Sequence, residues 1–151
     1  GYRLSLHSGS DKFSIYPYFA EYLEEAIHVK TAGTSYLEAI RLVAEKNPVL
    51  FRRIHDFALD RFDEDRATYH VETDLSNVPG PEELPDEELP GLLDEDDSRQ
   101  VLHVTYGSVL TEKNNGQYVF KDEINETLKE YEERHYQLLE SHLGGHLELL
   151  T

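Results

Sequence analysis

Histidines at equivalent places in three short segments are the residues of this sequence best placed to do chemistry together. Each segment alternates apolar and polar residues, which predicts a β-strand with one apolar and one polar face. The polar faces carry His7, His28 and His103, in segments 3–7, 27–31 and 101–106. Neutral imidazoles that converge on one cavity suit a divalent metal ion or proton transfer. The alternative is that each histidine is simply a hydrogen-bonded interior residue.

The turns that follow the first two segments could bind an anion. Residues 8–10 (Ser-Gly-Ser) can present backbone N–H groups and hydroxyls, and Lys12 adds a positive charge. Asp11 could orient Lys12, bind a metal ion or transfer a proton. The second turn, residues 31–35, also precedes a helix. Neither turn has the glycine spacing of a P-loop or of a dinucleotide-binding site, so an ordinary helix start is the alternative.

The elements expected around these residues alternate between strands and helices. Helices are expected over residues 14–25, from a Ser35–Glu38 capping box, from Asn47-Pro48 to about residue 65, and from about residue 122 to Gly144-Gly145, which ends or kinks it. Strands that alternate with helices indicate parallel βα units. Three units are too few for a closed barrel. We therefore expect an α/β fold in which residues 1–151 are the C-terminal portion of one TIM-type (β/α) barrel domain, or else a small open α/β layer.

Charge and composition exclude several classes of protein. The chain has 151 residues and a net charge of −17, which argues against binding to nucleic acid or to an anionic membrane. It has no apolar run of membrane-spanning length. It contains no cysteine, which excludes disulfides and thiolate chemistry and fits a cytoplasmic protein. The chain begins with glycine and has no methionine, so either its start was processed or it is a fragment of a longer protein. The pattern of elements favours the fragment.

The negative charge is concentrated in one segment. Eleven acidic residues and no Lys or Arg lie between Ala67 and Ser98, together with four prolines. This composition predicts an exposed acidic loop at about 72–99, before the last strand. A docking arm for a partner, or a cation-binding loop, is the functional alternative.

Four stretches of the sequence resemble the tagaturonate epimerase family. They are residues 4–17 (LSLHSGSDKFSIYP), 28–39 (HVKTAGTSYLEA), 65–71 (DRATYHV) and 102–107 (LHVTYG). The resemblance covers most of the chain outside the acidic loop. It implies a metal-dependent sugar-acid epimerase that interconverts tagaturonate and fructuronate in hexuronate catabolism; some relatives act on fructose and tagatose.

The resemblance also implies roles for particular residues. His7 would be a metal ligand, and zinc, manganese, cobalt and nickel are all plausible metals. The catalytic acid and base would lie upstream of this chain, so the piece alone should be inactive. From their facing and chemistry, we expect the substrate contacts to be Ser10, Asp11, Lys12, His28, Lys30 and His103.

Two other functions stay open at this stage. One is another metal-dependent barrel enzyme, such as a sugar isomerase or aldolase. The other is a non-enzymatic acidic binding module that uses the acidic loop. Because a piece of a barrel exposes unpaired strand edges, we also expect the rest of the barrel, or a second copy, to cover them.

Overall fold

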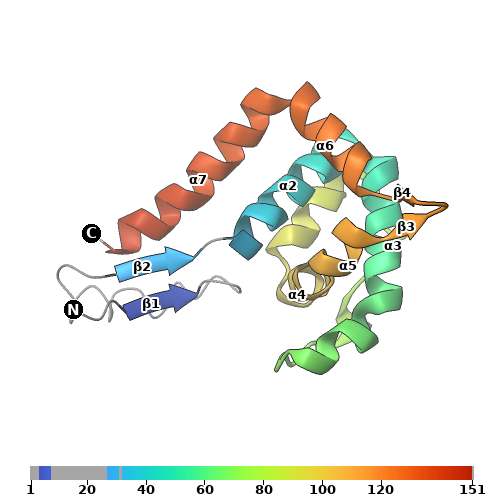
Figure 1. The fold of residues 1–151 in the computed structure, drawn as a ribbon, viewed down its shortest axis with the longest axis horizontal. Coiled ribbons are helices and arrows are strands. Elements are labelled where there is room, and N and C mark those ends of the chain that lie inside the picture. Colours follow the sequence, from blue (N-terminus) through green and yellow to red (C-terminus); the bar gives the residue numbers. More distant parts are fainter. Residues whose placement is uncertain (1–3, 8–26, 31, 151) are drawn as a thin grey trace.

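Helices make up most of the described part of the chain, with a small parallel sheet beside them (Figure 1). The computed structural model describes residues 4–7, 27–30 and 32–150, with side chains at 35–142 and 144. The elements, in chain order, are β1 (Leu4–His7), β2 (Ile27–Lys30), α2 (Ala32–Lys46), α3 (Pro48–Asp65), η2 (Arg66–Thr68), η3 (Leu75–Asn77), η4 (Asp86–Asp94), α4 (Asp96–Val104), α5 (Tyr106–Thr111), β3 (Lys113–Asn114), β4 (Gln117–Tyr118), α6 (Lys121–Glu130) and α7 (Glu132–Leu150).

The first two predicted strands are confirmed, and they pair in parallel. Leu4 lies opposite Ile27 and Leu6 opposite Val29, so the apolar positions of β1 match the apolar positions of β2. Parallel pairing requires a crossover between the strands. The helix expected in that crossover, residues 14–25, lies outside the described residues. The barrel itself is not seen in the described part, which contains this parallel pair and one short antiparallel hairpin, β3–β4.

Helices α2 and α3 form much as the sequence predicts. The Asn47 side-chain oxygen accepts a hydrogen bond from the Leu50 N–H at 3.2 Å, and Pro48 occupies the first helical position. This N-cap satisfies an N–H group that has no partner within the helix. The predicted start of α2 is wrong, because the helix begins at Ala32 and places Ser35 and Glu38 inside it.

The third predicted strand, residues 101–106, is wrong. These residues form the end of α4 and the start of α5, and Val101, Leu102 and Val104 are buried. Asp96 and Asp97 lie in the first turn of α4, where carboxylates interact favourably with the helix dipole. A helix satisfies its backbone hydrogen bonds internally, whereas a strand needs a neighbouring strand. His103 therefore lies on a helix and not on a sheet.

The acidic segment 72–99 is not the exposed loop that its composition predicts. It contains η3, η4 and the start of α4, and Leu89, Leu92 and Leu93 are buried in the core. Its carboxylates are largely exposed, while its leucines pack inward, so the segment belongs to the folded body.

Two basic side chains of α3 hold the acidic segment by its backbone. Arg52 donates hydrogen bonds to the carbonyl oxygens of Pro81 and Leu84 and to the Asp86 carboxylate. The Nε2 atom of His55 lies 2.9 Å from the Pro79 carbonyl oxygen. Because His55 is fully buried, desolvation lowers its imidazole pKa below the usual 6.5. The neutral ring then donates from Nε2.

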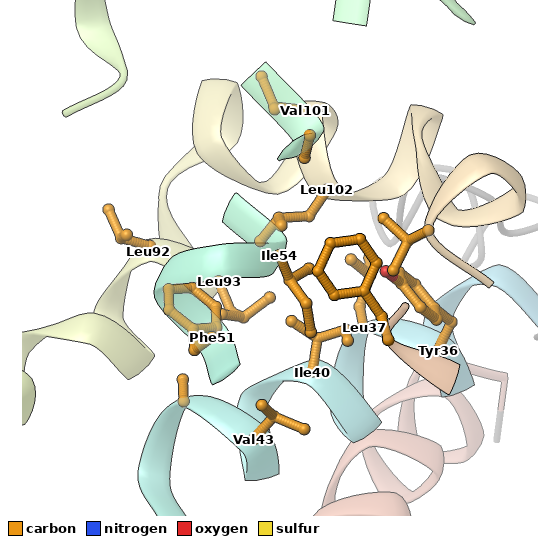
Figure 2. Packing of buried hydrophobic residues seen from close by; sticks show 14 of the residues in the cluster. Tyr36, Leu37, Ile40, Val43, Phe51, Ile54, Leu92, Leu93, Val101 and Leu102 are labelled. Atoms are coloured by element: carbon orange, nitrogen blue, oxygen red, sulfur yellow. The ribbon is translucent and has the colours of Figure 1, made fainter. Parts of the chain in front are cut away.

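The hydrophobic core lies where α2, α3, η4 and α4 meet. Figure 2 shows Leu37 and Ile40 of α2, Phe51 and Ile54 of α3, and the segment's Leu93 packed together. Burial of such side chains supplies about 1.5–3 kcal/mol each. The core therefore joins the acidic segment to the two helices that follow the sheet.

The C-terminal region differs from the single long helix that the sequence predicts. It forms α6 and α7, which are separated at Tyr131. Gly144-Gly145, which the sequence predicts will end or kink the helix, does not end it, because α7 runs through both glycines to Leu150. Before α6, Asn115 and Gly116 have φ angles of 52° and 77° in the turn between β3 and β4. These left-handed values suit an Asn-Gly hairpin turn.

Among the described residues, no helix combines the length and the apolar character that crossing a membrane requires.

Candidate functional site

The candidate site is the edge of the β1–β2 sheet at which both strands end. His7 and Lys30 are the last residues of their strands and lie opposite each other in the parallel register. His28 lies opposite Ser5, one pair earlier. Neighbouring strands are about 4.8 Å apart, so the polar positions of both strands form one patch. Ligands of parallel α/β proteins bind at the carboxyl ends of the strands.

The structure places some of the predicted site residues at one edge of the sheet, while others lie outside its described part. The strand positions of His7, His28 and Lys30 are confirmed, while their side chains lie outside the described part. Ser10, Asp11 and Lys12 also lie outside the described residues. The convergence of imidazoles from His7, His28 and His103 consequently stays a prediction. For His103 its premise of a shared sheet is wrong, because His103 lies on α4.

His103 instead belongs to a row of three rings, which we define as the aromatic row: Tyr36, His103 and Tyr106. The rings of His103 and Tyr106 are stacked, with centroids 6.3 Å apart and an interplanar angle of 13°. The rings of Tyr36 and Tyr106 are tilted at 51°, with centroids 5.8 Å apart. Both separations are typical of favourable ring pairs. The row thus joins α2 to the junction between α4 and α5.

A buried carboxylate lies further along α2 and faces a guanidinium and an imidazole. Glu38 is 4% exposed, and its carboxylate lies 3.2 Å from Arg41 Nε and 3.5 Å from His142 Nδ1 of α7. Arg41 also forms a two-point contact with Asp94, at 2.8 and 3.2 Å. Although burial opposes its charge, these carboxylates raise the pKa of Arg41 above its usual value. This network joins α7, α2 and η4.

A second ion pair fastens α7 to the end of α2. Arg134 binds the two carboxylate oxygens of Glu45 at 2.8 and 2.9 Å. These hydrogen bonds lower the pKa of Glu45. Burial lowers the pKa of His135, the next residue of α7, although the negative charge of Glu38 opposes the shift. The contacts in both networks are made within the chain, which indicates that these groups support the fold.

The described side chains do not form a complete metal site. Within the part of the chain whose side chains are described, no group of three or more His, Asp or Glu side chains is arranged to hold a metal ion. His7 supplies a suitable donor type at the end of β1, and Lys30 opposite it is not a metal ligand at neutral pH. His7 is therefore compatible with one ligand of a metal site whose other ligands come from outside the described side chains.

Comparison with known proteins identifies the class to which this arrangement belongs. A family model described as tagaturonate epimerase matches residues 1–150. The tagaturonate/fructuronate epimerase of Thermotoga maritima is 50% identical over 150 residues, which are 99% of this chain and 30% of that protein. The fold and the sequence thus define a segment of a protein of this family.

Solved structures agree with this assignment. The native crystal structure of the fructuronate–tagaturonate epimerase from Cohnella laeviribosi superposes with a TM-score of 0.92 at 50% identity, and a glycerol complex of that enzyme matches equally well. The match covers 99% of this chain and 31% of that one. The chain belongs to the tagaturonate epimerase family, and it spans about 30% of the length of the relatives it matches. The resemblance seen in the sequence is confirmed.

Two residues near the candidate site were not singled out from the sequence, namely Tyr36 and Tyr106. Tyr36 is buried, as expected of a residue that packs between helices. Tyr36 lies only six residues after the end of β2, in the first turns of the helix that follows a strand. A residue in the first turns of a helix that directly follows a strand lies near the end of that strand, and this could have been seen in the sequence.

Proposed function

We propose that the longer protein containing this chain is a divalent-metal-dependent epimerase that interconverts D-tagaturonate and D-fructuronate in hexuronate catabolism. The observation that carries this proposal is 50% identity over 150 residues to a protein named for that activity. The parallel register of β1 and β2 supports it, because it places His7 and Lys30 at one edge. The TIM-type barrel and the cytoplasmic location stay predictions for the longer protein.

The proposed reaction requires more than proton transfer at the carbon next to the ketone. The carbon that is inverted is β to the ketone, so enolisation towards the α carbon alone cannot invert it. Cleavage of the bond between the α and β carbons, rotation of the aldehyde, and re-formation of that bond would do so. A bound divalent metal ion would supply Lewis-acid polarisation of the substrate's oxygen atoms. The catalytic acid and base are expected upstream of this chain.

Within this scheme, His7 would hold the metal ion, and the cationic groups would hold the sugar acid. Lys30 or Lys12 would pair with the uronate carboxylate. Because the protein has a net charge of −17, an anionic substrate needs such a local cationic group in order to bind. Ser10, Asp11 and His28 would contact the substrate's hydroxyls. His103 remains a proposed contact, now from the aromatic row on α4 and not from a strand.

The test uses the full-length protein and purified substrates. Tagaturonate, fructuronate and fructose are each incubated with the enzyme before and after metal removal with a chelator, and the products are resolved by chromatography. We expect the two uronates to interconvert, with activity lost on chelation and restored by one of zinc, manganese, cobalt or nickel. The His7→Ala variant should bind less metal than the wild type. Failure to convert either uronate would refute the proposal, and cleavage products would favour an aldolase.

The alternative of an acidic binding module receives no support from the fold of the acidic segment. A docking arm needs a backbone that is free to meet a partner. Here Arg52 and His55 bind carbonyl oxygens of the segment, and its leucines lie in the core.

A further inference from the structure

Tyr106 is the exposed member of the aromatic row. Its side chain is 38% exposed, whereas Tyr36 beneath it is 9% exposed. The next residue, Gly107, has open space around it, since none of the described heavy atoms lies within 4 Å of where a Cβ would be. The ring of Tyr106 is therefore supported from inside by the row and is accessible from outside.

The junction that carries Tyr106 is held in place on both sides. The Thr105 hydroxyl donates a hydrogen bond to the Val101 carbonyl oxygen at 2.7 Å, and Thr105 is fully buried. The Ser108 hydroxyl donates to the Asp65 carboxylate at 2.6 Å, which fastens α5 to the end of α3. The position of the Tyr106 ring is thus set by the fold before any ligand binds.

The aromatic row lies close to the end of β2 at which the candidate site begins. Only one residue separates β2 from α2, and Tyr36 is the fifth residue of α2. Two Cα–Cα steps through this linker and four helical steps place the Cα of Tyr36 at most about 13 Å from the end of β2. The contact between the rings of Tyr36 and Tyr106 places the junction of α4 and α5 beside the first turns of α2, and Figure 1 shows that α2 begins directly after β2. An aromatic face that is both rigid and exposed here is suited to line a ligand site.

We propose that Tyr106 is a substrate-contacting residue of the epimerase, with its ring face packed against the C–H face of the sugar acid. This inference rests on the proposed function. The carboxylate and hydroxyls of the sugar need polar partners, but its C–H groups form an apolar face that an aromatic ring covers. The His103 ring is stacked on Tyr106 and supports that ring from α4. Burial raises the pKa of the Tyr36 phenol, so the buried end of the row stays neutral.

The test compares ring removal with ring retention in the full-length enzyme. We expect Tyr106→Ala to raise the KM for tagaturonate about tenfold, the loss of one good ring contact, with kcat changed less than threefold. Tyr106→Phe keeps the ring and should keep KM within twofold. The matched control is Tyr136→Ala, which removes an exposed tyrosine of α7 that is hydrogen-bonded to Glu132. Thermal melting of each variant reports on folding, and Tyr106→Leu replaces Tyr106→Ala if the latter does not fold.

Each outcome decides between the proposals. An unchanged KM in a folded Tyr106→Ala or Tyr106→Leu enzyme overturns the ring contact and leaves the proposed function intact. An equal rise in KM for Tyr106→Phe also overturns it, because the hydroxyl and not the ring face would then be the contact. A wild-type protein that converts neither uronate refutes the proposed function, and this inference with it.

Discussion

Removing the Arg52 side chain should release the acidic segment from α3. Arg52 is 16% exposed at its side chain, and its guanidinium bonds two backbone carbonyl oxygens and the Asp86 carboxylate. The two carbonyl bonds are worth about 1 kcal/mol each, and the pair with Asp86, which is largely exposed, adds at most about 1 kcal/mol. We therefore expect Arg52→Ala to lower the free energy of local opening by about 2–3 kcal/mol.

Hydrogen exchange of the full-length protein measures this opening directly. A loss of 2–3 kcal/mol corresponds to amide exchange that is about 30- to 150-fold faster over residues 79–94. The matched control is Arg53→Ala, the neighbouring arginine, whose partner Glu123 is 46% exposed. That surface pair is worth about 0.2–1 kcal/mol, so exchange over residues 79–94 should not change. If Arg52→Ala accelerates exchange there no more than Arg53→Ala does, Arg52 does not stabilise the acidic segment and the reasoning is refuted.

Three further changes test the fold. Leu93→Ala should lower the free energy of unfolding, measured in urea, by about 2–5 kcal/mol because Leu93 is fully buried. The control Glu87→Ala, on the exposed side of η4, should change it by no more than about 0.5 kcal/mol. Equal effects of the two substitutions would mean that the segment is outside the core. His55 has a folded-state pKa below its unfolded value of 6.5, so its contribution to stability is complete above that value and is lost as the pH falls below about 6.5. The His55→Gln variant should therefore show a flatter dependence of the urea midpoint on pH between 7 and 5, and an unchanged slope would contradict burial of a neutral imidazole. Asn47→Ala removes the N-cap of α3 and should cost about 1 kcal/mol, and a neutral result in the same unfolding assay would show that the cap bond does not contribute.

The sequence correctly predicted the helices and strands whose position depends on residues close together in the chain. Asn47 followed by Pro48 identifies the start of α3, because both residues act on the first turn alone. The alternation in β1 and β2 identifies two half-buried strands, and the register aligns their apolar positions. The family resemblance rests on the same blocks of sequence, and the comparisons confirm it.

The prediction failed where six residues satisfy two patterns at once. Residues 101–106 alternate like a strand, yet Val101, Leu102 and Val104 also fall on one buried side of a helix. A segment this short does not distinguish the two periods. No strand among the described residues pairs with this segment, whereas a helix needs no partner for its backbone. The prediction also failed for the acidic segment. Its high charge indicated an exposed loop, but leucines of the same segment are buried in the core.

The sequence by itself determined the family, the two parallel strands with their polar positions at one edge, and the helix that starts at Asn47-Pro48. Each of these depends on neighbours along the chain or on the identity of residues. Only the tertiary structure decided that Arg52 and His55 bind the backbone of the acidic segment, and that the Tyr106 ring contacts Tyr36 and stacks on His103. Except for the stacking of His103 on Tyr106, these contacts join residues 24 to 70 positions apart. No local pattern encodes them, because they exist only once the core brings the helices together.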